Sequence, residues 1–551
     1  MTTSCLDAKI VDTTLTDKYY KTELHAQNAI LGVYSYLYAF NYHKVNWPMV
    51  MAAMEDAMFV TSTGVPESMS NNTHSATTGP AINFWGSLYG GINAANEVLE
   101  RVPGIAFDDE NDRGRILAEA HFLRAMYHYD AVRLYGGIDG VPIKIKAAQT
   151  MEDAYTEVSP ASAVYQFIIE ELEYAAGTNE DGTLRLPLYK NAVSDVGRAT
   201  NGSARALLAD VYNTMGRWED AIANADIVIN SSQYRLLDNY ADLWDVEKEA
   251  LSYNEHILVV PFFRDLDAVE DSSLGSQAAR FYCPNGINED GSNLSGNVYG
   301  KGEGTYRVQK WFIRYFQDDQ GNLGYSDGTK DASSTVANLT YKDYRIETSF
   351  FRKFLSKNNE TGVTGNKTAY PAAGSGQDNW GYIKKYIDPK GISNRTNENN
   401  IVRLRLSDMY LIKAEAYNEL GQYDKACQAI DMVRERARKA NGAARVWPKF
   451  VGSDRTDNIG RTLSKDEFRW LVFMERGLEF AGEQKRWFDL KRMKKDDTQM
   501  MYDYMMTTFI PGRPGGDIQS NWAVLAERKK WLPKPYNEVQ RNPHVKQNPG
   551  F

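Results

Sequence analysis

The strongest grouping of side chains with catalytic potential is a run of three glutamates, Glu475, Glu479 and Glu483. They recur every four residues, so a helix would carry all three carboxylates on one face. A glycoside hydrolase needs two carboxylates flanking a glycosidic bond, in one class about 5 Å apart. Glu475 and Glu479 therefore define a hydrolase hypothesis. However, basic and large apolar residues are interleaved with them, which favours a network of ion pairs that ties the helix to its neighbours.

Other chemical motifs fail on spacing or context. The glycine-rich stretch 300–304 lacks the strand before it and the helix after it that a phosphate loop requires. A stretch resembling a calcium loop has Gly286 and Asn297 at its first and last ligand positions, where acids are needed. His121 and His128 share one helix without an acidic third ligand, so packed histidines are expected. We predict no metal, no cofactor and no catalytic centre.

The helices that must position these side chains are visible as apolar residues at spacings of three and four. This periodicity covers Gln27–Tyr38, Trp85–Arg101 and Arg113–Leu134. Ser159, followed by proline, is a helix N-cap. Ser464 starts a capping box that opens a helix carrying Phe468, Leu471, Val472 and Met474. The chain is predicted to be mainly α-helical.

Two helical hairpins repeat one residue pattern. Seven positions are matched at a constant separation of 205 residues: Ala209, Tyr212, Gly216, Trp218, Ala221, Ala225 and Val228 with Ala414, Tyr417, Gly421, Tyr423, Ala426, Ile430 and Val433. Small residues where two helices touch, and a glycine in the turn, are typical of tetratricopeptide hairpins. Chance similarity explains seven positions in register poorly.

The chain between these hairpins has a different composition. Residues 284–304 contain six Gly and four Asn, and a second such region spans 357–400. Gly and Asn at this density indicate turns and irregular backbone. We therefore predict a tetratricopeptide-like scaffold from residues 11–240 and 400–551, and a loop-rich binding region from 241–399 packed on it. Residues 1–10 are interpreted as an N-terminal linker.

Overall composition excludes several classes of protein. Of the 551 residues, 42% are hydrophobic and 25% charged, which is typical of globular chains and excludes disorder. No apolar run approaches the roughly 20 residues that span a bilayer. The formal net charge of -9 argues against a nucleic-acid partner. Aromatic residues reach 12%, which suits a large core and also flat platforms on which sugar rings stack.

The three cysteines, Cys5, Cys283 and Cys427, lie far apart, so neither a disulfide framework nor a zinc site is indicated. Cys427 is expected in a helical core. Cys5 follows Thr-Thr-Ser, a small-residue run like the end of a bacterial lipoprotein signal. The charged and apolar parts of such a signal do not precede it here. The interpretation of Cys5 as a lipid-bearing residue therefore takes Met1 as an artificial start.

Five motifs follow one another in a recognisable order: WGSLYGGINAAN at 85–96, AEAHFLRAMY at 118–127, GRATNGSARAL at 197–207, ERGLEFAGEQKRWFDL at 475–490 and QNPGF at 547–551. Together they resemble the SusD/RagB family of outer-membrane nutrient-uptake lipoproteins. The resemblance implies a helical tetratricopeptide-type scaffold carrying an irregular binding region. It also implies a lipid anchor at Cys5, on the outer face of the outer membrane of Bacteroidetes-type bacteria. The expected partner is a SusC-like TonB-dependent transporter, and the expected ligands are oligosaccharides.

The resemblance places ligand contacts in three stretches, about 40–85, 270–310 and 350–386. Tyr and Trp there would stack on sugar rings, while Asn, Asp and Arg would bond hydroxyl pairs. Trp85 opens a helix within a family-wide motif, so a core role is expected somewhat more than a binding role. The candidate carbohydrate-binding residues are Asn41, Asp56, Trp85, Tyr282, Cys283, Tyr299, Arg352 and Trp380.

Three functions are therefore compared. The leading one is a non-catalytic surface protein that captures glycans and delivers them to the transporter. The second is a glycoside hydrolase using Glu475 and Glu479, which would have to line an open cleft. The third is a cytosolic tetratricopeptide scaffold for peptides, against which the aromatic insert and Cys5 both weigh. A signal sequence encoded upstream would separate the first from the third.

Overall fold

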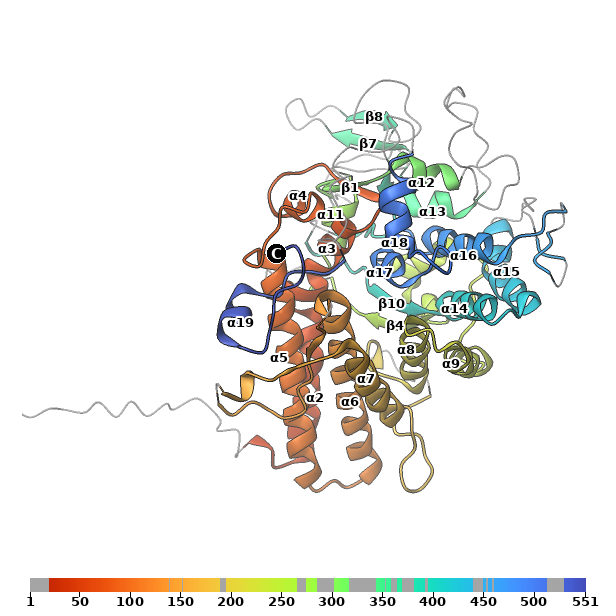
Figure 1. Ribbon diagram of the computed structural model, residues 1–551. Helices are drawn as coiled ribbons and strands as arrows, with labels where there is room; N and C mark the ends of the chain where they lie inside the picture. Colours follow the sequence, from red (N-terminus) through yellow and green to blue (C-terminus); the bar gives the residue numbers. More distant parts are fainter. Residues whose placement is uncertain are drawn as a thin grey trace, which may run out of the picture.

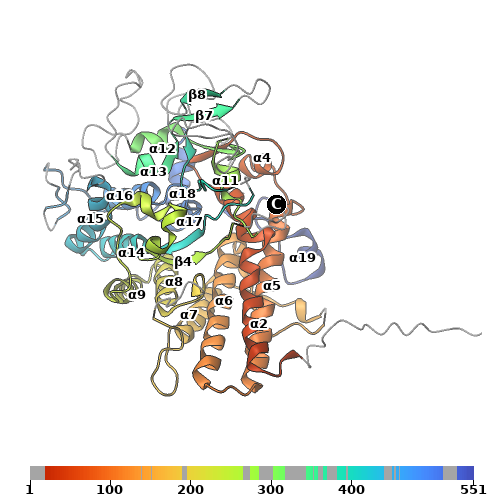
Figure 2. The ribbon, with the colours of Figure 1, turned by 180° about the vertical axis from the view of Figure 1, so that it is seen from behind.

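The computed structural model describes residues 19–137, 139–150, 152–188, 195–264, 274–284, 302–316, 343–351, 353–357, 364–368, 381–391, 395–439, 449–451, 454–457, 460–512 and 530–551. Long helices form one end of the molecule, and short strands and helices gather at the other end (Figures 1 and 2). The predicted linker and Cys5 lie outside the described residues.

Four long helices form the N-terminal half of the scaffold: α2 (Glu23–Ser35), α5 (Gly79–Arg101), α6 (Glu110–Tyr135) and α7 (Ala161–Ala175). They pack side by side (Figure 1). The Thr22 hydroxyl caps α2 by accepting a bond from the backbone N–H of His25, and Asp109 caps α6 in the same way. These caps satisfy N–H groups that the first helical turn leaves without a partner.

The paired glycines of the WGSLYGG motif have a packing role. A Cβ on Gly91 would lie 2.6 Å from the ring of Tyr127 on α6, and one on Gly90 would lie 2.5 Å from the ring of Tyr36. Helix α5 can approach its neighbours this closely only because these two positions lack a side chain. This part of the motif therefore serves the scaffold.

The predicted repeat is confirmed. The first hairpin is α8 (Asn201–Thr214) with α9 (Trp218–Asn230), and the second is α14 (Leu406–Glu419) with α15 (Tyr423–Lys439). The turn glycines Gly216 and Gly421 adopt φ angles of 72° and 73°, a left-handed conformation that favours glycine. Helix α9 packs on α14, so the two hairpins stack although the insert separates them in sequence.

Two antiparallel strands, β4 (His256–Val260) and β10 (Ile401–Arg405), pair near the points where the chain enters and leaves the insert. Within it, β6 (Phe350–Phe351) pairs with β9 (Tyr382–Ile383), and β7 (Lys353–Lys357) with β8 (Thr364–Thr368). Its strand β5 (Tyr306–Val308) pairs with β1 (Met58–Val60), which comes from the N-terminal part of the chain. Its short helices are α10 (Glu249–Ser252), α11 (Ala278–Tyr282), α12 (Lys310–Tyr315) and α13 (Arg345–Ser349). The described part of the insert is thus more regular than its composition indicates.

The remaining elements are α3 (Asn46–Met54), α4 (Val65–Ser70), β2 (Val141–Pro142), β3 (Val158–Ser159), α16 (Lys465–Glu479), α17 (Arg486–Arg492), α18 (Met501–Tyr504) and α19 (Tyr536–Arg541). Strand β2 pairs with β3. The predicted capping box is present, because Ser464 and Glu467 bond each other's backbone N–H groups.

The proline-rich tail docks on the scaffold. The backbone N–H of Leu532 donates to the carbonyl of Leu134 over 2.8 Å. The Asn548 side-chain amide donates to the carbonyls of Tyr135, over 3.0 Å, and Leu532, over 2.7 Å. The tail thereby satisfies carbonyls at the end of α6.

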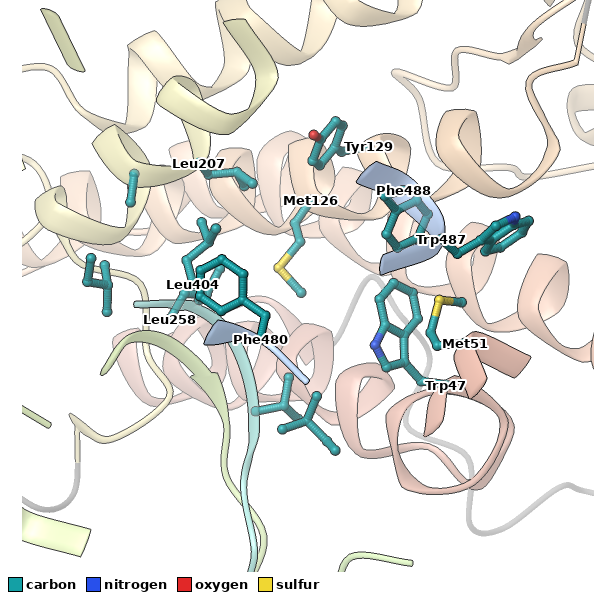
Figure 3. Packing of buried hydrophobic residues seen from close by; sticks show 14 of the residues in the cluster. Trp47, Met51, Met126, Tyr129, Leu207, Leu258, Leu404, Phe480, Trp487 and Phe488 are labelled. Carbon is teal, nitrogen blue, oxygen red and sulfur yellow. The ribbon is translucent and has the colours of Figure 1, made fainter. Parts of the chain in front are cut away.

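One continuous apolar cluster joins the scaffold to the insert. In the close-up, Trp47 of α3, Met126 of α6 and Phe488 of α17 pack together, and Leu258 of β4 lies against Leu404 of β10 (Figure 3). The insert therefore shares the core of the helices. Within the part of the chain that the structure describes, no helix is long and apolar enough to cross a membrane.

Candidate functional site

The three stretches expected to carry ligand contacts meet at one end of the molecule. Strand β1 comes from the first stretch and pairs with β5 from the second, with Met58 opposite Val308. The backbone N–H of Val308 also donates to the carbonyl of Gly381, over 2.8 Å, which joins the third stretch to the same sheet. We call this region, residues 58–70, 302–308 and 381–383, the insert end. It lies opposite the long helices (Figure 1).

Polar and half-buried side chains are present on the insert end. Thr61 is exposed, and its hydroxyl donates to the carbonyl of Gly304 over 2.7 Å. The half-buried guanidinium of Arg307 lies over the ring of Tyr382, 4.9 Å from its centroid. Hydroxyl and guanidinium groups of this kind can bond sugar hydroxyls. Sequence reasoning did not single out Arg307 or Tyr382, although a basic residue between Tyr306 and Val308 on a strand is a usable signal.

Three of the predicted contact residues are instead core groups. Asp56 is 0% exposed, and both of its oxygens accept bonds from Arg486, over 2.8 and 2.9 Å. Tyr282 is 1% exposed and donates its hydroxyl to the carbonyl of Pro48 over 2.7 Å. Cys283 is fully buried. Their polar groups serve the fold, because burial without a partner would be costly.

Of the five remaining predicted residues, the structure describes Trp85 and Asn41. Trp85 packs against Tyr89 and Tyr135, with ring centroids 4.6 and 5.2 Å apart, so it has the core position expected for it. Asn41 is exposed, beside the exposed ring of Phe40. Tyr299, Arg352 and Trp380 lie outside the described residues.

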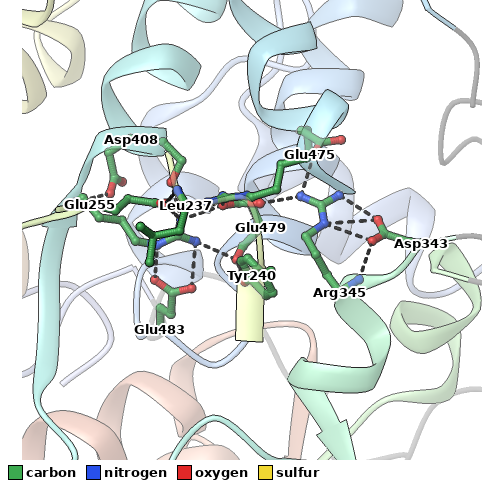
Figure 4. A network of polar contacts seen from close by, with 12 residues as sticks. Leu237, Tyr240, Glu255, Asp343, Arg345, Asp408, Glu475, Glu479 and Glu483 are labelled. Atoms are coloured by element: carbon green, nitrogen blue, oxygen red, sulfur yellow. Dashed lines mark hydrogen bonds and ion pairs between the residues drawn. The ribbon is translucent and has the colours of Figure 1, made fainter. Parts of the chain in front are cut away.

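The three glutamates are buried, and they form ion pairs rather than a cleft (Figure 4). Glu475 pairs with Arg345 over 2.7 Å, and Glu479 pairs with Arg345 over 2.7 Å and with Arg405 over 2.5 Å. Glu483 pairs with Arg405 over 3.0 Å. The ion-pair interpretation is confirmed. The expectation that one helix carries all three glutamates is wrong, because α16 ends at Glu479 and Glu483 lies in the turn after it. Neither carboxylate of the hydrolase hypothesis is accessible to a polysaccharide, since Glu475 is 1% exposed and Glu479 0%.

This network joins the insert to the scaffold. Arg345 comes from α13 and Lys385 follows β9, both within the insert. Lys385 pairs with Glu483 over 2.7 Å. Burial alone would raise the pKa of Glu483, but the positive charges of Arg405 and Lys385 outweigh it and lower the pKa to about 2. Burial also opposes ionisation of Glu479, and three arginines hold its pKa well below the ordinary value. Both carboxylates therefore stay charged.

The two histidines of α6 contact protein groups. The Nδ1 atom of His128 lies 2.8 Å from the carbonyl oxygen of Arg124, and its Nε2 atom accepts a bond from the backbone N–H of Lys144 over 3.3 Å. His121 lies 3.0 Å from Glu171. Among the described residues, no group of three metal-ligating side chains comes together.

Two family models together match most of the chain. One, described as the SusD family, matches residues 254–551. The other, described as starch-binding associating with outer membrane, matches residues 12–214. The chain belongs to the SusD family. The second description states that proteins matched by that model associate with the outer membrane. The family predicted from the five motifs is thus confirmed.

Known SusD-like proteins match the chain over most of their length. SusD-like protein P2 of Formosa agariphila is 26% identical over 543 residues, which cover 97% of this chain and 94% of that protein. A SusD-like protein of Bacteroides ovatus is 24% identical over 497 residues, covering 84% of this chain and 80% of the other.

Solved structures establish the fold. A SusD homologue from Bacteroides thetaiotaomicron covers 97% of this chain and 98% of its own, with a TM-score of 0.73 at 19% identity. A laminarin-binding SusD-like protein gives 0.68 at 23% identity, covering 97% of this chain and all of its own. Surface glycan-binding protein A of B. thetaiotaomicron, solved with laminarihexaose, also gives 0.68, at 19% identity, and covers 96% of this chain and 100% of its own. The predicted mainly α fold is confirmed.

Proposed function

We propose that this SusD-family protein is a non-catalytic glycan-binding protein of the cell surface. It captures oligosaccharides and delivers them to a SusC-like TonB-dependent transporter. Family membership supports glycan binding, as do the fold neighbours whose names state laminarin or glycan binding. The single observation that carries the location of the site is the meeting of three distant stretches of chain at the insert end.

The binding surface that we propose combines two sets of residues. Thr61, which is exposed beside β1, and the half-buried Arg307, which lies over the buried ring of Tyr382, supply hydrogen-bonding groups. The second set, Tyr299, Arg352 and Trp380, lies outside the described residues and is close in sequence to Gly302, Phe351 and Gly381. Stacking on an aromatic ring contributes about 1 kcal/mol or more beyond the buried area. Loss of Trp380 is therefore expected to weaken binding more than loss of Thr61.

Anchoring at the outer face of the outer membrane is proposed through lipid on Cys5. One acyl chain gives only marginal membrane attachment, whereas several chains make it stable. A full-length form with a lipoprotein signal, expressed in a Bacteroidetes host, is expected to be released from whole cells by external protease. Retention of Cys5→Ala in the soluble fraction would support the anchor, and unchanged membrane attachment of that variant would contradict it.

Glycan binding is tested by native affinity electrophoresis through gels containing different soluble polysaccharides, laminarin among them, with a parallel assay for new reducing ends. Retardation by at least one glycan without new reducing ends is expected. Trp380→Ala and Arg307→Ala should reduce the retardation, whereas Trp218→Ala, on the first repeat hairpin, should not. New reducing ends that disappear in Glu475→Gln would overturn the proposal in favour of a hydrolase.

Delivery to a transporter is a separate claim with its own test. The lipidated protein, co-expressed with the transporter encoded beside it, is expected to co-purify with it from detergent-solubilised outer membranes. Uptake of the bound oligosaccharide should fall when the binding protein is deleted. Normal uptake and no co-purification would contradict delivery without affecting the binding proposal.

A further inference from the structure

A cleft lies away from the residues of the insert end. It has a volume of about 310 Å³ and lies between α6, α7, α8, the β4–β10 pair and α17. We call it the Lys491 cleft. Tyr165, Thr214, Met500 and Trp531 line it and are half-buried, so the cleft has an open side. Its volume is near the lower end of the range for small-molecule sites, roughly 300–1,000 Å³.

The walls of this cleft combine aromatic rings with cations. Arg133 lies between two rings, 3.8 Å from the centroid of Tyr129 and 4.1 Å from that of Phe488. Another cation of the cleft wall, Arg403, lies 4.3 Å from the ring centroid of Trp47. These rings belong to different elements, as Figure 3 shows for Trp47, Tyr129 and Phe488. Flat rings beside polar groups form the kind of lining that holds a small ring-shaped ligand.

The charges around the cleft are unequally matched. Five lining cations have carboxylate partners: Arg133 with Asp210, Arg403 with Asp130, Arg476 with Asp489, Lys485 with Asp408 and Arg492 with Glu415. Lys491 differs from them. Its ammonium group donates to the backbone carbonyl of Arg133 over 2.6 Å, lies 3.8 Å from the ring centroid of Trp487 and, within the described residues, forms no ion pair with a carboxylate. An ammonium group has three donors, so further donor capacity remains.

Two more donors beside the cleft lack partners. The Nε atom of Arg133 and the Nη1 atom of Arg476 are buried and make no hydrogen bond, and Arg476 is only 3% exposed. Buried polar atoms are nearly always bonded, so an acceptor placed in the cleft would satisfy these donors. Burial, and then the positive charge of Arg133, lower the pKa of Lys491 well below its ordinary value. A bound anion would offset both effects.

We propose that the Lys491 cleft is a second ligand site, which takes a sugar-sized ring bearing one anionic group, such as a uronic acid. The anionic group contacts Lys491 and the unpaired guanidinium nitrogens, and the ring lies against the aromatic walls at the open side. The ligand is either a free sugar acid or the terminal residue of an acidic oligosaccharide. This site stands independently of the proposed glycan surface at the insert end.

The test is isothermal titration of the whole purified chain with glucuronic acid, with glucose as the neutral control. Glucuronic acid should bind and glucose should not. Lys491→Gln should weaken binding about tenfold or more, the loss expected for a hydrogen bond to a charged group. Lys491→Arg should largely retain it. Lys494→Gln, an exposed lysine on the same segment, should bind as the unmodified protein does.

Additional titrations distinguish a free sugar acid from an oligosaccharide end as the ligand, and they show whether lost binding reflects a folding defect. An oligosaccharide ending in glucuronic acid that binds as tightly as the free acid identifies a chain end as the ligand, whereas binding of the free acid alone identifies a sugar acid. Tyr165→Ala, at the open side, should also weaken binding without touching Lys491. Arg307→Ala should leave glucuronic acid binding unchanged, which separates this site from the insert end. Equal weak binding of glucose and glucuronic acid, or full binding by both Lys491→Gln and Tyr165→Ala, would overturn the proposal.

Discussion

At the scale of single residues, the buried ion pairs around Glu479 are the feature with the largest energetic consequence. Glu479 contacts Arg345, Arg405 and Arg436 and is fully buried. Removing one member of such a set leaves uncompensated buried charge. We expect Glu479→Gln to lower the free energy of unfolding by about 3–5 kcal/mol, measured by denaturant titration. Glu23→Gln, near the start of α2, is the surface control, and a loss there as large as that of Glu479→Gln would contradict the account.

The same network predicts a response to acid. The pKa of Glu483 is lowered from the ordinary 4.5 to about 2 in the folded protein. A carboxylate with a depressed pKa contributes stability above its unfolded pKa and loses it as the pH falls through the folded value. Stability should therefore decline between about pH 4.5 and pH 2. The decline should be shallower in Glu483→Gln, and equal slopes in thermal melts across that range would contradict the prediction.

The sequence did not distinguish ligand-contacting residues from core residues in the three stretches expected to bind ligand. Parts of the three stretches meet at the insert end, but Asp56, Tyr282 and Cys283, which the resemblance implied as ligand contacts, are buried. A helix reveals its inward face by periodicity, whereas short strands and turns rich in Gly and Asn have no such period. Nothing in the sequence indicated that Arg486, far along the chain, neutralises Asp56.

At the scale of elements, the packing of α5 depends on its glycines. Gly91 faces the Tyr127 ring, so Gly91→Ala creates an overlap, for which about 1–3 kcal/mol of destabilisation is expected. Gly86 lies on the exposed side of the same helix with nothing within 4 Å of an added Cβ. Gly86→Ala should therefore stabilise the protein by about 0.5–1 kcal/mol. Thermal unfolding of the two variants checks the pair, and equal shifts would contradict this role of Gly91.

The helical elements were predictable because each carries its own local signals. The repeat hairpins appeared as seven matched positions, with Gly216 and Gly421 at the turns. The capping box at Ser464 marked the start of α16. The pairing of β4 with β10, in contrast, joins strands separated by the whole insert. Partners this distant leave no local pattern in one sequence.

At the scale of the whole molecule, a helical scaffold and an insert share one core and one buried charge network. A surface held in place by such contacts before binding loses less entropy when a ligand binds. The buried positions of Glu475 and Glu479 count against the hydrolase hypothesis that rests on these two carboxylates.

Isothermal titration of the purified chain with laminarihexaose and other defined oligosaccharides is the most direct test of the proposed glycan site. Chromatography of each ligand after the titration shows whether it was cleaved. We expect saturable binding of at least one oligosaccharide and a clear loss of affinity in Trp380→Ala. The bound oligosaccharide should be recovered uncleaved, at full length. Recovery of shortened oligosaccharides, or full affinity in Trp380→Ala and Arg307→Ala together, would contradict a non-catalytic glycan site at the insert end.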